Sequence, residues 1–146
     1  MTELKDKVRH ALTETRIILP GTQALLGFQL IIMLMSGWDR LPPSSRYVHL
    51  LSLAATAVAM IWLLTPAAWH RIVERGEDSE EFHRTASRFL LGAMAVLALA
   101  IAGDYFVVAR QITGSLGLAA SASAFLLCLF YGMWFALPLV ARRLKR

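Results

Sequence analysis

One acidic residue stands inside an otherwise apolar stretch of this sequence. Asp104 lies in an alanine-rich run, next to Gly103. If that run crosses a bilayer, the carboxylate must face protein or water, because lipid has no partner for it. A carboxylate in such a place could bind a proton or a small cation. The alternative is a structural ion pair near the membrane surface, with Arg40, Arg46 or Arg110 as its partner.

A second set of candidates lies between Glu14 and Gly37. Polar side chains recur there every seven residues, at Thr15, Thr22, Gln29 and Ser36. A seven-residue spacing returns to nearly the same face of a helix, and Gln23 lies on the neighbouring row. Thr22, Gln23 and Gln29 could line an ion path with Asp104 near its outer mouth. Alternatively, they form hydrogen bonds to neighbouring helices.

Charged residues also gather where apolar segments are predicted to leave the membrane on the inner side. The members of this predicted inner-end cluster are Glu14, Arg16, His70, Arg71 and Arg88. Intramembrane charges usually pair with one another, so we expect a structural role that ties helix ends together. His70 and Arg71 could also meet lipid headgroups.

The histidines and the single cysteine do not indicate a cofactor. His49 and His70 stand at opposite ends of one apolar segment, whereas bis-histidine haem ligation needs partners on facing helices. Cys128 is alone, which excludes an intrachain disulfide, and no metal-ligand spacing is present. No nucleophile triad or glycine-rich phosphate loop occurs either. The sequence therefore predicts a protein that is not an enzyme and has no metal or cofactor.

Composition sets the class of protein that must position these residues. Of the 146 residues, 57% are hydrophobic and 17% are charged, and the apolar residues form long blocks. These blocks predict an all-α, polytopic four-helix membrane bundle in a single domain, residues 1–146. A short amphipathic helix is predicted along the inner membrane surface at 1–16. The expected spans are 17–38, 48–69, 89–108 and 114–140. Ser79, followed by two glutamates, is suited to begin the third helix.

Small residues in the last apolar segment predict close helix packing. Gly117, Ser121 and Ala124 follow one another at steps of four and three, which places them along one side of a helix. Helices in lipid associate through such seams because packing must replace the missing hydrophobic driving force.

The distribution of basic residues predicts the orientation. Twelve Lys and Arg residues fall in the N-terminal segment, the connection after the second span and the C-terminal tail, against Arg40, Arg46 and Arg110 on the other side. This asymmetry predicts cytoplasmic N- and C-termini in the cell membrane, with anionic headgroups as inner partners. The basic residues behind the net charge of +5 flank the predicted spans and are explained by this topology, so nucleic acid is not an expected partner.

Several of these residues resemble a family of small bacterial integral membrane proteins known only as a domain of unknown function. The resemblance covers about residues 3–110, and the positions that carry it are Glu14, Arg16, Gly21, Gln23, Pro66, Ala68, His70 and Arg71. Gln29 departs from the family pattern, in which an aliphatic residue is expected there. Some relatives carry a sodium:proton antiporter label, and the resemblance implies transport as one possible activity.

The sequence is compatible with two functions from different classes. The first is a homo-oligomeric channel or transporter for protons or small ions, because several copies could gather their polar rows around one path. The second is a non-transporting membrane scaffold or accessory module that binds a partner. The position of the first-helix amides should distinguish them, because amides bonded inside a dry bundle would remove the main support for transport.

Overall fold

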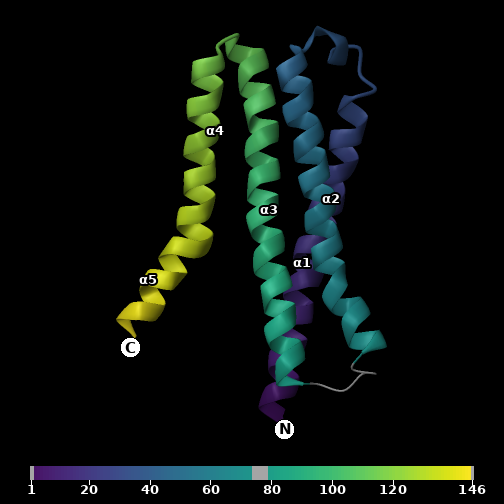
Figure 1. The fold of residues 1–146 in the computed structure, drawn as a ribbon, viewed down its shortest axis with the longest axis vertical. Helices are drawn as coiled ribbons and strands as arrows, with labels where there is room; N and C mark the ends of the chain where they lie inside the picture. Colours follow the sequence, from purple (N-terminus) through teal and green to yellow (C-terminus); the bar gives the residue numbers. More distant parts are fainter. Residues whose placement is uncertain (1, 74–78, 146) are drawn as a thin grey trace.

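The computed structural model describes residues 2–73 and 79–145, with the backbone alone for residues 2, 3, 5 and 7. Four helical rods run alternately up and down, and both termini lie at the same end of the bundle (Figure 1). The rods are α1 (Thr2–Ile32), α2 (Pro43–Ile72), α3 (Glu80–Thr113), and α4 (Leu116–Tyr131) continued by a π-helical segment (Gly132–Ala136) and α5 (Leu137–Leu144). Each rod is long and apolar enough to cross a membrane. The predicted all-α fold with four spans is confirmed.

The helix ends follow local sequence signals. The Ser79 hydroxyl accepts a hydrogen bond from the Phe82 N–H at 3.0 Å, so Ser79 caps α3 as the sequence predicts. At the other end of α3, Gly114 has a φ of 66°, a left-handed conformation that favours glycine. Ser115 then caps α4. This compact turn lies at the same end of the bundle as the short 3₁₀ helix η1 (Trp38–Arg40), opposite the termini. We call these two ends the η1 end and the terminal end.

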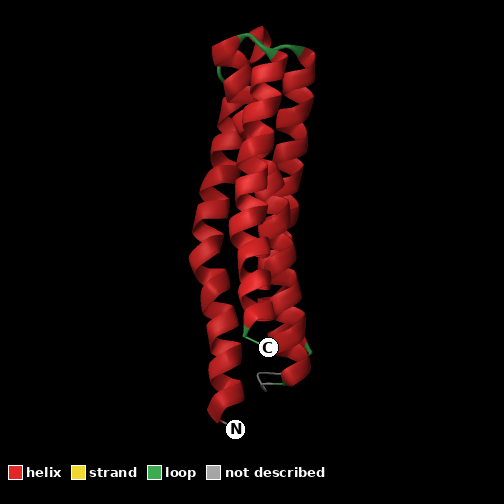
Figure 2. Ribbon diagram, turned by 90° about the vertical axis from the view of Figure 1, so that its left-hand side faces the viewer, coloured by secondary structure: helices red, strands yellow, loops and turns green. Residues whose placement is uncertain are grey.

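Helices α1, α2 and α3 form a three-helix core, and α4 packs against α3 at its edge (Figures 1 and 2). The buried positions of α2 alternate steps of four and three, as expected for a helix that meets its neighbours along one seam. They are Ser45, His49, Ser52, Thr56, Ala59, Leu63 and Pro66. The seam is therefore polar toward the η1 end and apolar toward the terminal end.

Apolar packing fills the middle and the terminal end of the core. In the middle, Ala59 and Leu63 of α2 pack with Leu90, Ala93 and Leu97 of α3. Nearer the terminal end, Val8 and Ala11 of α1 pack with Phe82 and Ala86 of α3. Both clusters combine alanines with larger leucine, valine or phenylalanine side chains, so close packing holds the helices together along these seams.

The N-terminal segment differs from its prediction. Residues 2–16 are not a separate surface helix; they form the first half of the continuous helix α1, in which Val8, Ala11 and Thr15 are buried. Their apolar side packs against the start of α3, because that helix begins at Glu80, nine residues before the predicted membrane span of 89–108. The amphipathic pattern therefore reflects a protein contact.

Five residues of the highly charged connection, 74–78, lie outside the described residues, as does the tail residue 146. Of the basic residues in the predicted inner set, Arg75 and Arg146 fall there, and the side chains of Lys5 and Lys7 are likewise not described.

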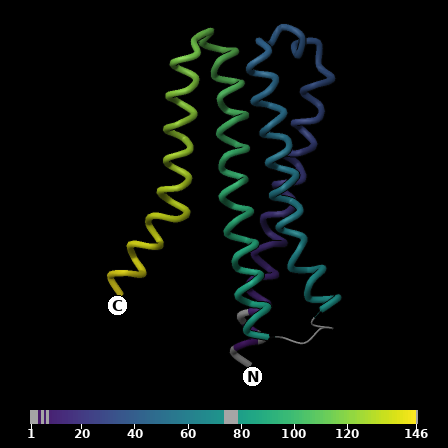
Figure 3. The backbone as a smooth tube through the Cα atoms, in the orientation of Figure 1, coloured from purple at the N-terminus to yellow at the C-terminus, as the bar shows by residue number. Residues whose placement is uncertain are grey.

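The fourth rod packs through other residues than predicted. Gly117, Ser121 and Ala124 are exposed, and the Ser121 hydroxyl donates to Gly117 O of its own helix. The contact with α3 is made by the opposite side of α4, where Ala119 is fully buried. Beyond the π-helical segment, α5 diverges from the bundle (Figure 3). The exposed small residues therefore do not form the seam with α3.

Candidate functional site

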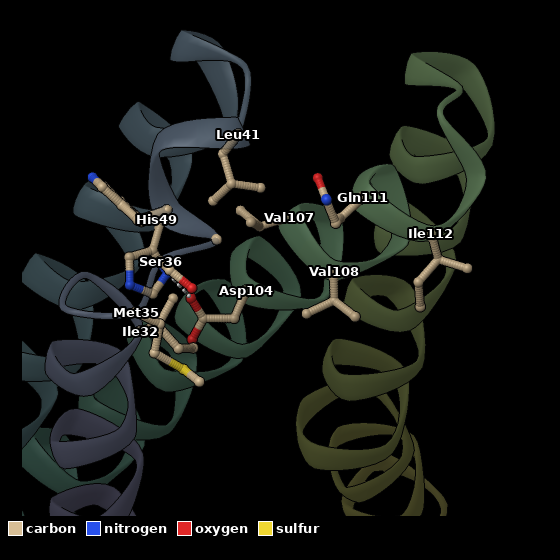
Figure 4. A pocket seen from close by; sticks show the side chains of 12 residues that line it. Ile32, Met35, Ser36, Leu41, His49, Asp104, Val107, Val108, Gln111 and Ile112 are labelled. Carbon is tan, nitrogen blue, oxygen red and sulfur yellow. Dashed lines mark hydrogen bonds and ion pairs between the residues drawn. The ribbon is translucent and has the colours of Figure 1, made fainter.

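Three polar side chains from three helices meet in the η1 half of the core. Gln29 of α1 donates a hydrogen bond from Nε2 to Asp104 Oδ2 of α3 at 2.6 Å. His49 of α2 approaches the other carboxylate oxygen, with Nδ1 3.1 Å from Asp104 Oδ1 (Figure 4). The second imidazole nitrogen, Nε2, lies 2.9 Å from the backbone oxygen of Gln29. We call Gln29, His49 and Asp104 the polar triad.

The helix seams explain why these residues meet. Gln29 continues the seven-residue row of Thr15 and Thr22, which are also buried, and His49 occupies the buried seam of α2. Beside the acid, Gly103 allows α2 and α3 to approach closely, because a Cβ added there would collide with Ser52 Oγ. The small distance between α2 and α3 brings the Asp104 carboxylate within hydrogen-bond distance of the His49 imidazole.

Burial makes the triad depend on its own hydrogen bonds. The side chains of His49 and Asp104 are 2% and 20% exposed, and Gln29 is buried. Asp104 lies nine residues before the end of α3 at Thr113, or about 13 Å at the usual rise of an α-helix. The acid therefore lies farther from the end of its helix than the sequence-based span of 89–108 predicts.

Both ring nitrogens of His49 lie at hydrogen-bond distance from an oxygen, and their donor and acceptor roles depend on the tautomer of the imidazole. The Gln29 backbone oxygen can only accept, so a hydrogen bond to it needs the ring hydrogen on His49 Nε2. Nδ1 and Asp104 Oδ1 then make a hydrogen bond only if one of them carries a further proton. Either an imidazolium donates to a carboxylate, or a carboxylic acid donates to a neutral imidazole. In either arrangement, the proton between the two groups would hold the imidazole and the carboxyl group together.

A pocket of about 340 Å³ opens next to this pair at the η1 end. Asp104 and His49 contribute its polar lining together with Ser36 and Gln111, while most of its wall is apolar (Figure 4). Trp38 also lines it, with its ring centroid 5.4 Å from that of His49. The carboxylate can therefore be approached from this end of the bundle.

The arginines expected to pair with Asp104 are engaged elsewhere or stay at the surface. Arg110 donates to the Ser44 hydroxyl at 2.6 Å. Arg46 donates to the backbone oxygens of Leu41 and Asp39. Arg40 is exposed on η1. The alternative of an ion pair between Asp104 and one of these arginines is not found among the described residues, because the carboxylate contacts His49 and Gln29 in the helix seam.

The predicted ion-path residues separate into three environments. Gln29 is part of the triad. Thr22 is buried, but its hydroxyl donates to Ile18 O of its own helix at 3.2 Å. Gln23 is exposed on the outer side of α1. Of the three, Gln29 alone is brought to Asp104.

The predicted inner-end cluster is brought together in part. Arg16, His70 and Arg71 line a common pocket between α1 and α2. Arg88 is on α3 and lines different pockets, whereas Glu14 is exposed. The structure shows no ion pair among Glu14, Arg71 and Arg88, three residues that it describes. The His70 ring packs against Phe82, with centroids 5.0 Å apart.

His49 is the site residue that the sequence analysis missed, since its position was considered only for haem. A signal exists in the sequence: Ser45, His49, Ser52 and Thr56 alternate steps of four and three, which marks a polar seam on one helix. For metals, the described residues contain no group of three or more His, Cys, Asp or Glu side chains that could hold an ion.

The four spanning rods and the buried polar triad define a multi-pass α-helical membrane protein. Residues 3–138 match the model of a family of unknown function (DUF6328), and the chain belongs to this family. The match confirms the resemblance and extends it from residue 110 through α4 to the start of α5. No curated protein and no solved structure matches the chain.

Proposed function

We propose that the protein transports protons or small cations across the cell membrane and that the polar triad is the ion-binding site. The observation that carries the proposal is the contact between His49 Nδ1 and Asp104 Oδ1, 3.1 Å apart in the core, because an imidazole and a carboxyl group at this distance can hold one proton between them. A transporter needs a group that binds its ion and releases it, and a carboxylate against an imidazole at membrane depth has this chemistry.

Loss of the proton would also change the helix contacts. Without it, the imidazole has one ring hydrogen, so its lone pair faces either the Asp104 carboxylate or the Gln29 backbone oxygen, and one attractive contact becomes repulsive. Since these side chains join α2 to α3, proton release would favour a rearrangement of the two helices. Such a coupling between ion occupancy and helix packing is what alternating access requires.

Another acceptor adjoins the site. Gln29 Oε1 is buried and has no hydrogen-bond partner among the described residues, although the same amide donates through Nε2 to Asp104. A buried acceptor without a donor is costly. A hydrated proton or a small cation in the triad would satisfy it, which supports cations over anions as the transported species.

Assembly of several copies is a further part of this proposal. Gln23 exposes an amide on the apolar outer side of α1, where lipid has no hydrogen-bond partner to offer. Gly117, Ser121 and Ala124 are exposed on α4, where a second copy could approach closely. We propose homo-oligomer contacts at these positions, with anionic lipid headgroups around the basic terminal end.

A flux assay tests the transport proposal directly. Purified protein in liposomes should dissipate an imposed proton, sodium or potassium gradient faster than empty liposomes do, and Asp104→Asn should remove that flux. Thr22→Val is the matched control, because the Thr22 hydroxyl is bonded to its own helix and lies away from the triad. Wild-type flux equal to that of empty liposomes for all three cations would overturn the proposal.

One observation favours the alternative of a non-transporting scaffold or accessory module. Below the triad, the seam contains the packed apolar residues Ala59, Leu63, Ala93 and Leu97, so a path to the terminal end requires helix movement. The flux result distinguishes the two functions, since a scaffold would keep the triad as a purely structural network.

A further inference from the structure

The pocket at the η1 end is graded from an exposed apolar rim to a buried polar end. Met35 and Ile112, at the rim, are 61% and 79% exposed, whereas the Asp104 side chain is 20% exposed. Ile32, Val107 and Val108 add further apolar wall (Figure 4). Its volume of about 340 Å³ lies in the range of pockets that hold small organic ligands. The gradient fits an amphipathic molecule whose polar head lies inward.

The charges around the pocket select a cationic head. Asp104 and His49 are the ionisable residues among those that line it, and no lysine or arginine is included. Arg46 and Arg110 are bonded to loop atoms instead. The carboxylate would therefore attract a positively charged group, and the indole of Trp38 adds an aromatic wall that favours cations.

We propose that this pocket binds a lipophilic primary ammonium compound, with its ammonium group at Asp104 and its apolar part between Met35, Val108 and Ile112. This inference rests on the proposed function and names an organic substrate class for the same site. An ammonium group has three N–H donors, so it can serve both Asp104 Oδ1 and His49 Nδ1. The hydrogen bond from Gln29 to Oδ2 stays in place.

Binding should displace the proton of the triad. Before binding, the His49–Asp104 pair shares one proton. After binding, the ammonium donates to both atoms, the imidazole is neutral and the carboxylate is negative. One ammonium ion enters and one proton leaves to solvent, so charge is balanced. The N–H or O–H bond that holds this proton breaks as the proton passes to water or buffer, and no other covalent bond changes. The exchange couples the organic cation to the proton at equilibrium.

Calorimetry on protein in phosphatidylcholine nanodiscs tests this proposal with a matched set of probes. 2-Phenylethylammonium should bind. The similarly sized 2-phenylethanol and phenylacetate should have affinities lower by about tenfold or more, because they lack the charged donor. Titration in buffers of different ionisation enthalpy should report close to one proton released per ammonium bound. Equal binding of the ammonium and the alcohol would overturn the proposal.

Three variants locate the binding. Asp104→Asn should remove the preference for the ammonium over the alcohol together with the proton release. Val108→Trp should fill the pocket and abolish binding, whereas Leu99→Trp is the matched control, since Leu99 is similarly exposed on α3 (49% against 51%) and does not line the pocket. Unchanged binding in Val108→Trp would place the ligand elsewhere and contradict the inference.

A last comparison separates the free amine from a lipid headgroup. Phosphatidylethanolamine carries a primary ammonium group and phosphatidylcholine does not. If added phosphatidylethanolamine competes with 2-phenylethylammonium in wild-type nanodiscs but not in Asp104→Asn nanodiscs, the natural ligand is a lipid amine. If it does not compete in wild-type nanodiscs, the site is assigned to free amines. Because these measurements detect binding without a gradient, a failed flux assay and a failed binding assay are separate outcomes.

Discussion

His49 and Asp104 are 55 residues apart in the sequence, and their side chains meet in the core with Nδ1 3.1 Å from Oδ1. The first prediction concerns the isosteric variant Asp104→Asn. Its amide can donate to His49 Nδ1 and accept from Gln29 Nε2, so all contacts of the triad can be kept without a dissociable proton. We expect a melting temperature close to that of the wild type in detergent.

Asp104→Leu is the contrasting variant at this position. It should leave His49 Nδ1 and Gln29 Nε2 buried without partners, at a cost of about 1–3 kcal/mol for each group. Comparison of the denaturant unfolding free energies of both variants checks this. Equal destabilisation by Asn and Leu would show that the hydrogen bonds do not hold the triad.

The second prediction concerns the close approach of α2 and α3. Gly103→Ala should destabilise the protein by about 1–3 kcal/mol, because the new Cβ meets Ser52 Oγ. Adding Ser52→Ala should recover most of this loss, since Oγ is the atom in collision. A double-mutant cycle from unfolding free energies measures the coupling. Gly27→Ala is the control, because a Cβ there meets nothing within 4 Å.

The third prediction concerns the attachment of α4. Ser123 donates to Ala102 O at 2.6 Å, and Tyr131 donates to Ala95 O at 3.0 Å. Ser123→Ala and Tyr131→Phe should each lower the unfolding free energy by roughly 0.6 kcal/mol, the average for interhelical hydrogen bonds in membranes. Ser121→Ala should have no such effect, since that hydroxyl bonds to its own helix. A larger loss in Ser121→Ala than in Ser123→Ala would contradict the assigned faces.

The fourth prediction concerns orientation. In a Cys128→Ala background, Ser44→Cys should react with an impermeant thiol reagent added outside intact cells, and Glu81→Cys should react only after the membrane is opened. Both positions are exposed and lie at opposite ends of the bundle, and Glu81 spares the capping residue Ser79. Labelling of both cysteines from one side would disprove the predicted topology.

The sequence by itself determined the class of fold and marked Gln29 and Asp104 as candidate site residues. Runs of apolar residues long enough to span a bilayer predict helices, because only internal hydrogen bonding satisfies a backbone in lipid. The seven-residue spacing of Thr15, Thr22 and Gln29 likewise placed these residues on one face, and the structure buries that face. Both inferences rely on periodicity within one segment, which is a local property.

Only the tertiary structure decided which helices contact one another and which side chains meet. His49 joins Asp104 because Gly103 lets α2 approach α3, and the sequence does not state that these two seams face each other. The same limit applies to Gly117, predicted for helix packing, and to Gln23, predicted for an ion path. Their residue types fit these roles, but both residues lie on exposed faces. In lipid both sides of such a helix are apolar, so the pattern along one helix does not reveal the side on which its neighbour packs.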